Sequence, residues 1–225
     1  ESWGGAKVKD VRTKSKHDPK WFTPCDAVAE HFTHKEVTFL SAAGGVYTQL
    51  SPMVANTLSK FFLAAGLKPL LQGYFEDEPC ISFRKSVLRR TQPLKAPADW
   101  HQDGAFMSPG IKSLNFWMSL TDCGEGTQSP GMDLIPKRLD EVVTPGINGA
   151  LFDWTVSPAT IKEDFTESPP VRPHFGVGDG IFFDHLNLHA TSFDESFKKK
   201  RYAIETWFFA RSHNAANQIP VALLG

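Results

Sequence analysis

The sequence has few cysteines, an almost balanced charge and no long apolar run. Its three cysteines, Cys25, Cys80 and Cys123, are scattered and odd in number, so neither a disulfide framework nor a cysteine-based zinc site is expected. We therefore expect a reducing, cytoplasmic environment. The net charge of -1 argues neither for nucleic acid nor for an anionic membrane surface as a partner, and no nucleic-acid partner is expected. No run of about 18 apolar residues is present to span a membrane.

Regular alternation of strands with helices is also missing. The clearest helix is predicted to begin at Ser51-Pro52, where an N-cap residue precedes a proline at the first helical position, and to end at Gly66. From Lys68 onward, short apolar segments bounded by turn residues are typical of strands, beginning with 70–75 and 80–88. With 18 Phe and six Trp to fill an interior, this pattern predicts a mainly β protein with flanking helices, an antiparallel barrel or jelly roll.

At 225 residues the chain fits one large domain, since barrels of this length are common. We expect residues 1–67 to form an irregular arm and packing helices, with a short helix over 26–32. The barrel core is predicted to cover 68–212, with an excursion at 144–170 that is rich in proline and glycine, and 213–225 to form a C-terminal tail. An excursion of this length on a rigid scaffold often carries specificity or acts as a lid.

The chemistry of the chain centres on His101 and Asp103. Side chains two residues apart in a strand lie on the same face, so this imidazole and this carboxylate are expected to project together. A metal held by the pair needs another protein ligand, and the apolar strand predicted over 181–191 offers His185 and His189. Both have the same parity in that strand, but position at its far end favours His189, and His185 is expected to be a core histidine. Two histidines and one carboxylate on one face of a metal are typical of non-haem Fe(II) oxygenases.

Two sets of basic residues, of which the first is Arg201 alone, are candidates for binding an anion. Arg201 opens the apolar strand predicted over 201–210, where an arginine is costly to bury without an anionic partner. Glu205 is one candidate partner. The carboxylate of a small ligand is the other, because the guanidinium fork binds carboxylates at two points, and Thr191 offers a further donor. The second group is either a solvated strand edge or a site for an acidic substrate, and it consists of Arg84, Lys85, Arg89, Arg90 and Lys95.

Four segments of the sequence form one pattern. They are Trp100-His101-Gln102-Asp103-Gly104, Leu114-Asn115-Phe116-Trp117, Gly178-Asp179-Gly180-Ile181-Phe182-Phe183 leading to His189-Ala190-Thr191, and Arg201-Tyr202-Ala203-Ile204. In this combination they resemble the phytanoyl-CoA dioxygenase-like family, over residues 97–210. Members of that family are Fe(II)- and 2-oxoglutarate-dependent oxygenases on a double-stranded β-helix, a cupin-like barrel.

The resemblance implies a set of iron ligands that are also the catalytic residues: His101, Asp103 and His189. It further implies a set of residues around the co-substrate 2-oxoglutarate: Arg201, Thr191, Asn115 and Trp117. O2 is the second co-substrate, and the implied reaction hydroxylates a C–H bond of a small-molecule or lipid-like substrate with release of succinate and CO2. Related halogenases carry a small residue at the carboxylate position, so Asp103 favours hydroxylation.

Two other classes of function stay open from the residues alone. A metal-dependent hydrolase or isomerase could use the same three ligands with zinc, but it has no need of Arg201. A non-catalytic binding module could keep the fold, but its function would require neither the three ligands nor Arg201. For the oxygenase, the cations from Arg84 to Lys95 indicate an anionic or acyl-carrier-linked substrate.

Overall fold

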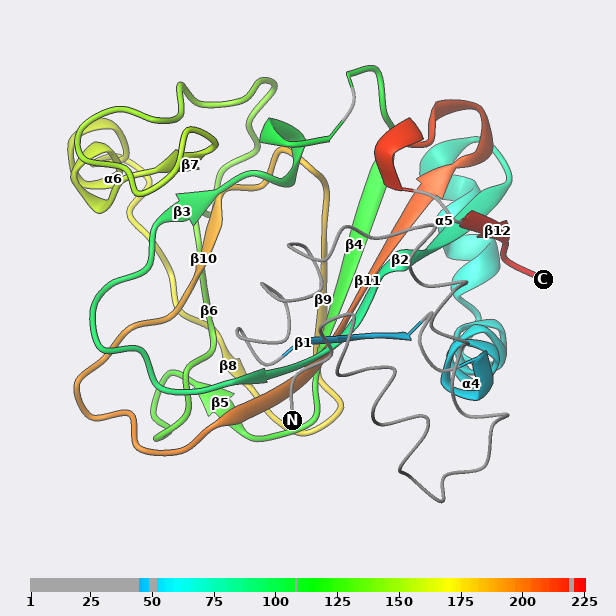
Figure 1. Ribbon diagram of the computed structural model, residues 1–225, viewed down its shortest axis with the longest axis horizontal. Helices are drawn as coiled ribbons and strands as arrows, with labels where there is room; N and C mark the ends of the chain where they lie inside the picture. Colours follow the sequence, from blue (N-terminus) through cyan, green and yellow to red (C-terminus); the bar gives the residue numbers. More distant parts are fainter. Residues whose placement is uncertain (1–44, 49–51, 108, 219–220) are drawn as a thin grey trace, which may run out of the picture. The chain divides into compact units, whose positions relative to one another are not determined.

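A computed structural model describes residues 45–48, 52–107, 109–218 and 221–225 (Figure 1). Cys25, Ser51 and the short helix expected over 26–32 lie outside these residues. The chain divides into two compact units: one contains the described residues up to Arg90, 111–113 and those from Ile204 onward, and the other contains 91–110 and 114–203. The predicted single domain over 1–225, with its boundaries at 67 and 212, stays a prediction.

The first unit is a small antiparallel sheet with two helices. β2 (Pro79–Thr91) pairs with β1 (Gly45–Tyr47) and with β12 (Val221–Leu223), and β11 (Arg201–Ala210) is its other neighbour. The short 3-10 helices η4 (Arg211–His213) and η5 (Ala216–Gln218) lie between β11 and β12. The predicted C-terminal tail over 213–225 therefore contains a strand that joins the sheet.

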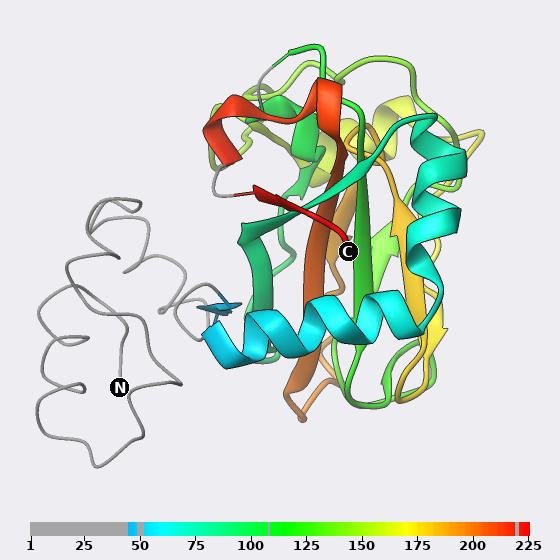
Figure 2. The ribbon, with the colours of Figure 1, turned by 90° about the vertical axis from the view of Figure 1, so that its right-hand side faces the viewer.

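Helix α4 (Pro52–Ala64) lies across this sheet, as Figure 2 shows. It begins at Pro52, as predicted, and buries an apolar face that includes Leu58 and Phe62. The ring of Phe62 meets that of Phe208 from β11 edge-on, with 5.3 Å between the centroids. Helix α4 therefore packs on the sheet, as expected of a helix that flanks a mainly β protein.

The strand predicted over 70–75 is wrong, because this segment lies in helix α5 (Leu67–Phe75). Leu71 and Phe75 are buried while Leu70 and Tyr74 are exposed, which is the spacing of one helical face rather than of a strand. A short apolar run does not distinguish a strand from a buried helical turn by its periodicity. The helix follows Gly66, whose φ of 73° suits glycine at the junction between the two helices.

The second unit consists of short strands with little helix. Its elements are β3 (Trp100–His101), η3 (Asp103–Ala105), β4 (Ser113–Ser119), β5 (Cys123–Gly124), β6 (Met132–Leu134), β7 (Thr155–Val156), α6 (Pro158–Asp164), β8 (His174–Phe175), β9 (Gly180–Phe183) and β10 (His189–Thr191). One sheet has the strand order β6-β10-β3-β7, while β4 pairs with β9 and β5 with β8, and these pairs are antiparallel (Figure 1). The mainly β architecture with flanking helices is thus confirmed.

The strand predicted over 181–191 is interrupted. β9 ends at Phe183 and pairs with β4, whereas β10 begins at His189 and pairs with β3 and β6. A turn separates them, in which Asp184 Oδ1 accepts a hydrogen bond from the backbone N–H of Leu186 (2.9 Å). The chain therefore passes from one sheet to the other just before His189.

The core of the second unit lies in two clusters. One packs Trp100, Ile135, Val156, Ile161 and Leu188 between the four-stranded sheet and α6. The other surrounds Trp117 with Met132, Phe175, Phe183 and Ala203. Within the part of the chain that the structure describes, none of the helices combines the length and the apolar character that a membrane span requires.

Candidate metal centre

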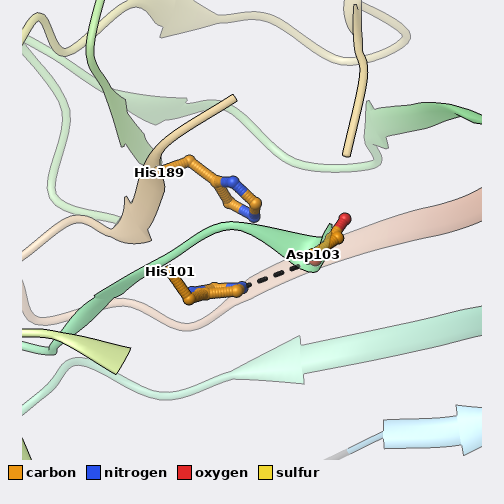
Figure 3. A group of neighbouring side chains, drawn as sticks. All are labelled: His101, Asp103 and His189. Carbon is orange, nitrogen blue, oxygen red and sulfur yellow. Dashed lines mark ion pairs between the residues drawn. The ribbon is translucent and has the colours of Figure 1, made fainter. Parts of the chain in front are cut away.

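His101 and Asp103 project to the same side of an extended segment (Figure 3). β3 ends at His101 and Asp103 opens η3, so the strand is shorter than predicted. Gln102 between them is nevertheless extended, with φ of -114° and ψ of 132°, so the alternation of side chains holds for this step. His101 Nε2 lies 3.8 Å from Asp103 Oδ1.

The pairing of β10 with β3 brings His189 opposite His101. Residues directly opposite in an antiparallel pair share a face, and the centroids of the two imidazoles are 4.3 Å apart. His189 Nδ1 lies 3.0 Å from the carbonyl oxygen of Asn187. A proton on Nδ1 that donates to this oxygen leaves Nε2 with a lone pair for a metal, the usual outer contact of a ligating histidine.

The three side chains together form a group that could hold a metal. One donor atom from each of His101, Asp103 and His189 lies within 4.8 Å of the others. Donor atoms at about 2.1 Å from one ion lie about 3 to 4 Å apart, a spacing that small side-chain rotations reach. Two imidazoles and one carboxylate match the ligand preference of Fe(II) and related divalent ions. The His101 side chain is 28% exposed and that of Asp103 is 3% exposed, so the group opens to solvent beside His101.

Asn115 fixes the carboxylate of the group. Its Nδ2 donates a hydrogen bond to Asp103 Oδ2 (3.3 Å), and the amide is buried. Asn115 on β4 lies opposite Phe183 on β9, whose ring centroid is 4.7 Å from that of His189. Outer contacts of this kind orient metal ligands and tune their affinity. Asn115 therefore contacts Asp103 directly and is the cross-strand partner of Phe183, whose ring packs against His189.

Arg201 is buried at the start of β11. Its guanidinium donates from Nη1 to the carbonyl oxygen of Gly131 and from Nη2 to Thr91 Oγ1 (2.9 Å). The same group lies 5.1 Å from the centroid of the Trp117 ring, a cation–π distance. The structure thus brings Arg201 and Trp117 together.

Thr191 and Arg201 converge on the same short segment. Thr191 is opposite Met132 in the β6–β10 pair. The carbonyl oxygen of Gly131 accepts hydrogen bonds from Arg201 and from the backbone N–H of Ser192 (3.2 Å). The ends of β10 and β11 that carry Thr191 and Arg201 are therefore both held at residues 131–132.

His185, the rival for the third ligand position, lies outside the metal group. It occupies the turn between β9 and β10, where its carbonyl oxygen accepts a hydrogen bond from the backbone N–H of Gly104 (2.8 Å). Burial lowers the pKa of the His185 imidazole below its ordinary value. His185 is half-buried in this turn, so it lies outside the metal group as expected, but the prediction that it is a core histidine is wrong.

The basic group on β2 is partly paired inside the first unit. Arg89 forms an ion pair with Glu205, the residue that the sequence offered as a partner for Arg201. Lys85 Nζ lies 4.8 Å from the centroid of the Trp207 ring. Arg84 is half-buried and Arg90 is exposed. A role of these four cations in substrate binding stays a prediction.

Gln102 is a site residue that the sequence analysis missed. Its side chain is 1% exposed, on the face opposite to His101 and Asp103. Nε2 donates to the carbonyl oxygens of Glu141 (3.0 Å) and Leu186 (2.7 Å), and Oε1 accepts from the backbone N–H of Val143 (2.7 Å). It therefore ties the segment between two predicted ligands to the loop before His189. The sequence held one sign of this role: Gln102 is a polar residue between two predicted ligands, where alternation turns its side chain to the opposite face.

We expect Gln102→Met to lower the free energy of unfolding by about 2 to 4 kcal/mol. Methionine fills a similar volume but leaves one backbone N–H and two carbonyl oxygens, all partly buried, without their partner, and a fully buried group in this state costs about 1 to 3 kcal/mol. Urea denaturation followed by circular dichroism measures the loss. The control is Gln72→Met, because the hydrogen bond of Gln72 to Glu78 is exposed and its removal should change stability by less than about 0.5 kcal/mol. Equal stabilities of the two variants would contradict the role of Gln102.

Comparisons with known proteins identify the fold. No family model and no curated protein matches the sequence. Among solved structures, EctD from S. alaskensis with 2-oxoglutarate and 5-hydroxyectoine has 16% identity and a TM-score of 0.56, over 94% of this chain and 69% of that one. The epimerase SnoN in complex with Fe3+, alpha ketoglutarate and nogalamycin RO has 17% identity and a TM-score of 0.54, over 97% and 74%. This chain spans 50% of the length of EvdO2 from Micromonospora carbonacea var. aurantiaca, which has 20% identity and a TM-score of 0.43 over 56% of this chain. The fold is the predicted double-stranded β-helix.

Proposed function

We propose that this chain is a non-haem Fe(II)- and 2-oxoglutarate-dependent dioxygenase of the phytanoyl-CoA dioxygenase-like type. One observation carries the proposal, the connection from the metal group to Arg201 along β4. Asn115 binds Asp103, and Trp117, two residues further on the same face, lies against the guanidinium. Residues i and i+2 of a strand are about 7 Å apart, a separation that suits a short dicarboxylate bound to a metal at one end and to Arg201 at the other.

The residues present fit an iron centre. His101, Asp103 and His189 supply the two imidazoles and one carboxylate that non-haem Fe(II) sites use. His189 is oriented by the Asn187 carbonyl and Asp103 by Asn115, so two of the three ligands are held before a metal binds. Iron bound there would supply the redox chemistry by which 2-oxoglutarate and O2 give succinate and CO2 while one oxygen atom enters a C–H bond. Arg201 and Thr191 would hold the far carboxylate of 2-oxoglutarate.

The structural neighbours support this class of chemistry. EctD was solved with 2-oxoglutarate, and SnoN with Fe3+ and alpha ketoglutarate, which agrees with the donor set of this chain. SnoN is named as an epimerase, so the fold accommodates more than one outcome. Hydroxylation is our proposal for this chain, with a small-molecule or lipid-like substrate, and mass spectrometry of the product for one added oxygen atom tests it.

Anaerobic titration of the Fe(II)-loaded protein with 2-oxoglutarate tests the proposed function. We expect the weak visible charge-transfer band of 2-oxoglutarate chelated to Fe(II), and we expect it to be lost in His189→Ala. Iron binding without the band would contradict the oxygenase and favour a hydrolase or isomerase that uses zinc. Failure to bind a divalent metal would favour a non-catalytic binding module.

A further inference from the structure

The exposed side of the metal group is lined by aromatic side chains. The ring of Trp154 meets that of His101 edge-on, with 5.8 Å between the centroids. Phe106 lies 5.3 Å from Trp154 and 6.4 Å from His101 by the same measure. Phe152 stacks on Trp154 with 5.5 Å between the centroids and an angle of 11° between the planes. We call Phe106, Phe152 and Trp154 the aromatic shelf.

Hydrogen bonds hold the loop that carries Phe152 and Trp154 against β3. Asp99 Oδ2 accepts from the backbone N–H of Leu151 (2.5 Å) and from Thr155 Oγ1 (2.6 Å). Thr155 lies opposite His101 in the β3–β7 pair, and its carbonyl oxygen accepts from the backbone N–H of Gly146 (2.8 Å). The position of Phe152 and Trp154 is therefore set by the strand that carries His101.

The outer part of the shelf is open to solvent. Phe152 is 49% exposed and its neighbour Leu151 is 69% exposed. Apolar surface fixed in an exposed position next to a reactive centre is a common feature of ligand sites. Parallel and edge-on ring contacts add about 0.5 to 1.5 kcal/mol beyond burial, so a ligand ring would gain from both Phe152 and Trp154.

We infer that the aromatic shelf is the subsite for the reacting end of the substrate, and that this end carries a flat, uncharged ring. The ring stacks on Phe152 and Trp154, which brings one of its edges to the exposed side of His101. The inference rests on the proposed function and adds the substrate class to it. The loop of 144–170, for which the sequence indicated specificity or a lid, is then a specificity element.

Paramagnetic relaxation by Mn(II), a divalent substitute for iron, tests the inference without turnover. The protein is loaded with Mn(II), saturated with 2-oxoglutarate and mixed with 1-naphthol as the ring probe, and proton relaxation of the probe is measured by NMR. Zn(II)-loaded protein is the diamagnetic reference. Because the enhancement falls steeply with distance, fast relaxation of the naphthol protons places the probe beside the metal group.

Phe152→Ala and Trp154→Ala should each weaken binding of the probe by about 3- to 10-fold, because each removes one ring contact. Trp154→Phe, which keeps a ring, should retain most of the affinity. The control is Tyr74→Ala, since Tyr74 is 47% exposed on α5 in the other unit. Equal affinity in all four variants would overturn the role of the shelf.

Two further readouts separate the possible failures. Hexanoate serves as a charged aliphatic probe. If Mn(II) enhances the proton relaxation of hexanoate and not that of naphthol, the inference is overturned and a substrate with an anionic aliphatic chain is favoured. Unchanged relaxation of both probes would also overturn the inference, provided that electron paramagnetic resonance shows Mn(II) to be bound and that the bound Mn(II) relaxes the protons of 2-oxoglutarate. If the Mn(II) spectrum stays that of the free ion, the proposed function itself fails, and the inference with it.

Discussion

Asp103→Ala is expected to abolish the metal-dependent turnover of 2-oxoglutarate, lowering succinate formation more than about 100-fold. Loss of an outer contact to a ligand costs about 10- to 100-fold in affinity or activity, and this change removes the ligand itself. The two imidazoles that remain carry no negative charge to offset that of a divalent ion. Because Asp103 is buried and bound by Asn115, solvent does not replace the carboxylate in the same geometry.

Metal binding should be lost together with turnover. A metal at 100 times its dissociation constant stabilises the native protein by about 2.7 kcal/mol, which thermal unfolding detects in the wild type and should not detect in Asp103→Ala. The control is Asp133→Asn: Asp133 binds Arg172 through both oxygens (2.7 and 2.9 Å) and Ser192. This variant should be less stable but keep its response to the metal. Near-normal turnover in Asp103→Ala would rule out the metal assignment.

Short-range geometry was enough to predict two members of the metal group. The alternation between His101 and Asp103 requires only that Gln102 be extended, and it is. The prediction therefore holds although β3 ends at His101. The third member, His189, was chosen for its place at the far end of a strand predicted over 181–191. That strand is not continuous, because the chain turns at 184–187 before His189 enters the sheet. No alternation rule crosses such a turn.

Contacts between segments far apart in the chain were beyond the sequence analysis. The pairing of Arg89 with Glu205 spans two strands whose register no local pattern specifies. The same is true of Gln102, which contacts a loop some forty positions away through Val143, and of Trp154, which reaches His101 only because β7 pairs with β3. Periodicity states which face a residue occupies, but not which segment packs there.

Segment 67–75 shows a second kind of limit. Its apolar residues suit a strand by composition, and a helix by the spacing of Leu71 and Phe75. Tertiary packing decides between such alternatives. Here the burial of these two residues on one side of α5, with Leu70 and Tyr74 left exposed, favours the helix.

Arg201→Lys is expected to weaken 2-oxoglutarate binding roughly 100-fold while leaving metal affinity unchanged. Lysine keeps the charge but loses the planar fork that binds a carboxylate at two points. Breaking one partner of a buried charge pair costs about 2 to 5 kcal/mol, which corresponds to a loss of about 30- to 5,000-fold in affinity, a range that includes this factor. The charge-transfer band of the Fe(II) protein, followed against 2-oxoglutarate concentration, gives the dissociation constant.

A comparison of two oxo acids separates binding from folding. Pyruvate has the metal-chelating end of 2-oxoglutarate but lacks the far carboxylate, so Arg201→Lys should leave its affinity unchanged. The control is Arg172→Lys, which removes a guanidinium fork from Asp133 on β6. This variant should be less stable but should bind pyruvate and 2-oxoglutarate with unchanged affinity. If Arg201→Lys weakens pyruvate as much as 2-oxoglutarate, Arg201 acts by holding the Gly131 segment in place. Loss confined to 2-oxoglutarate requires that the guanidinium contacts the far carboxylate.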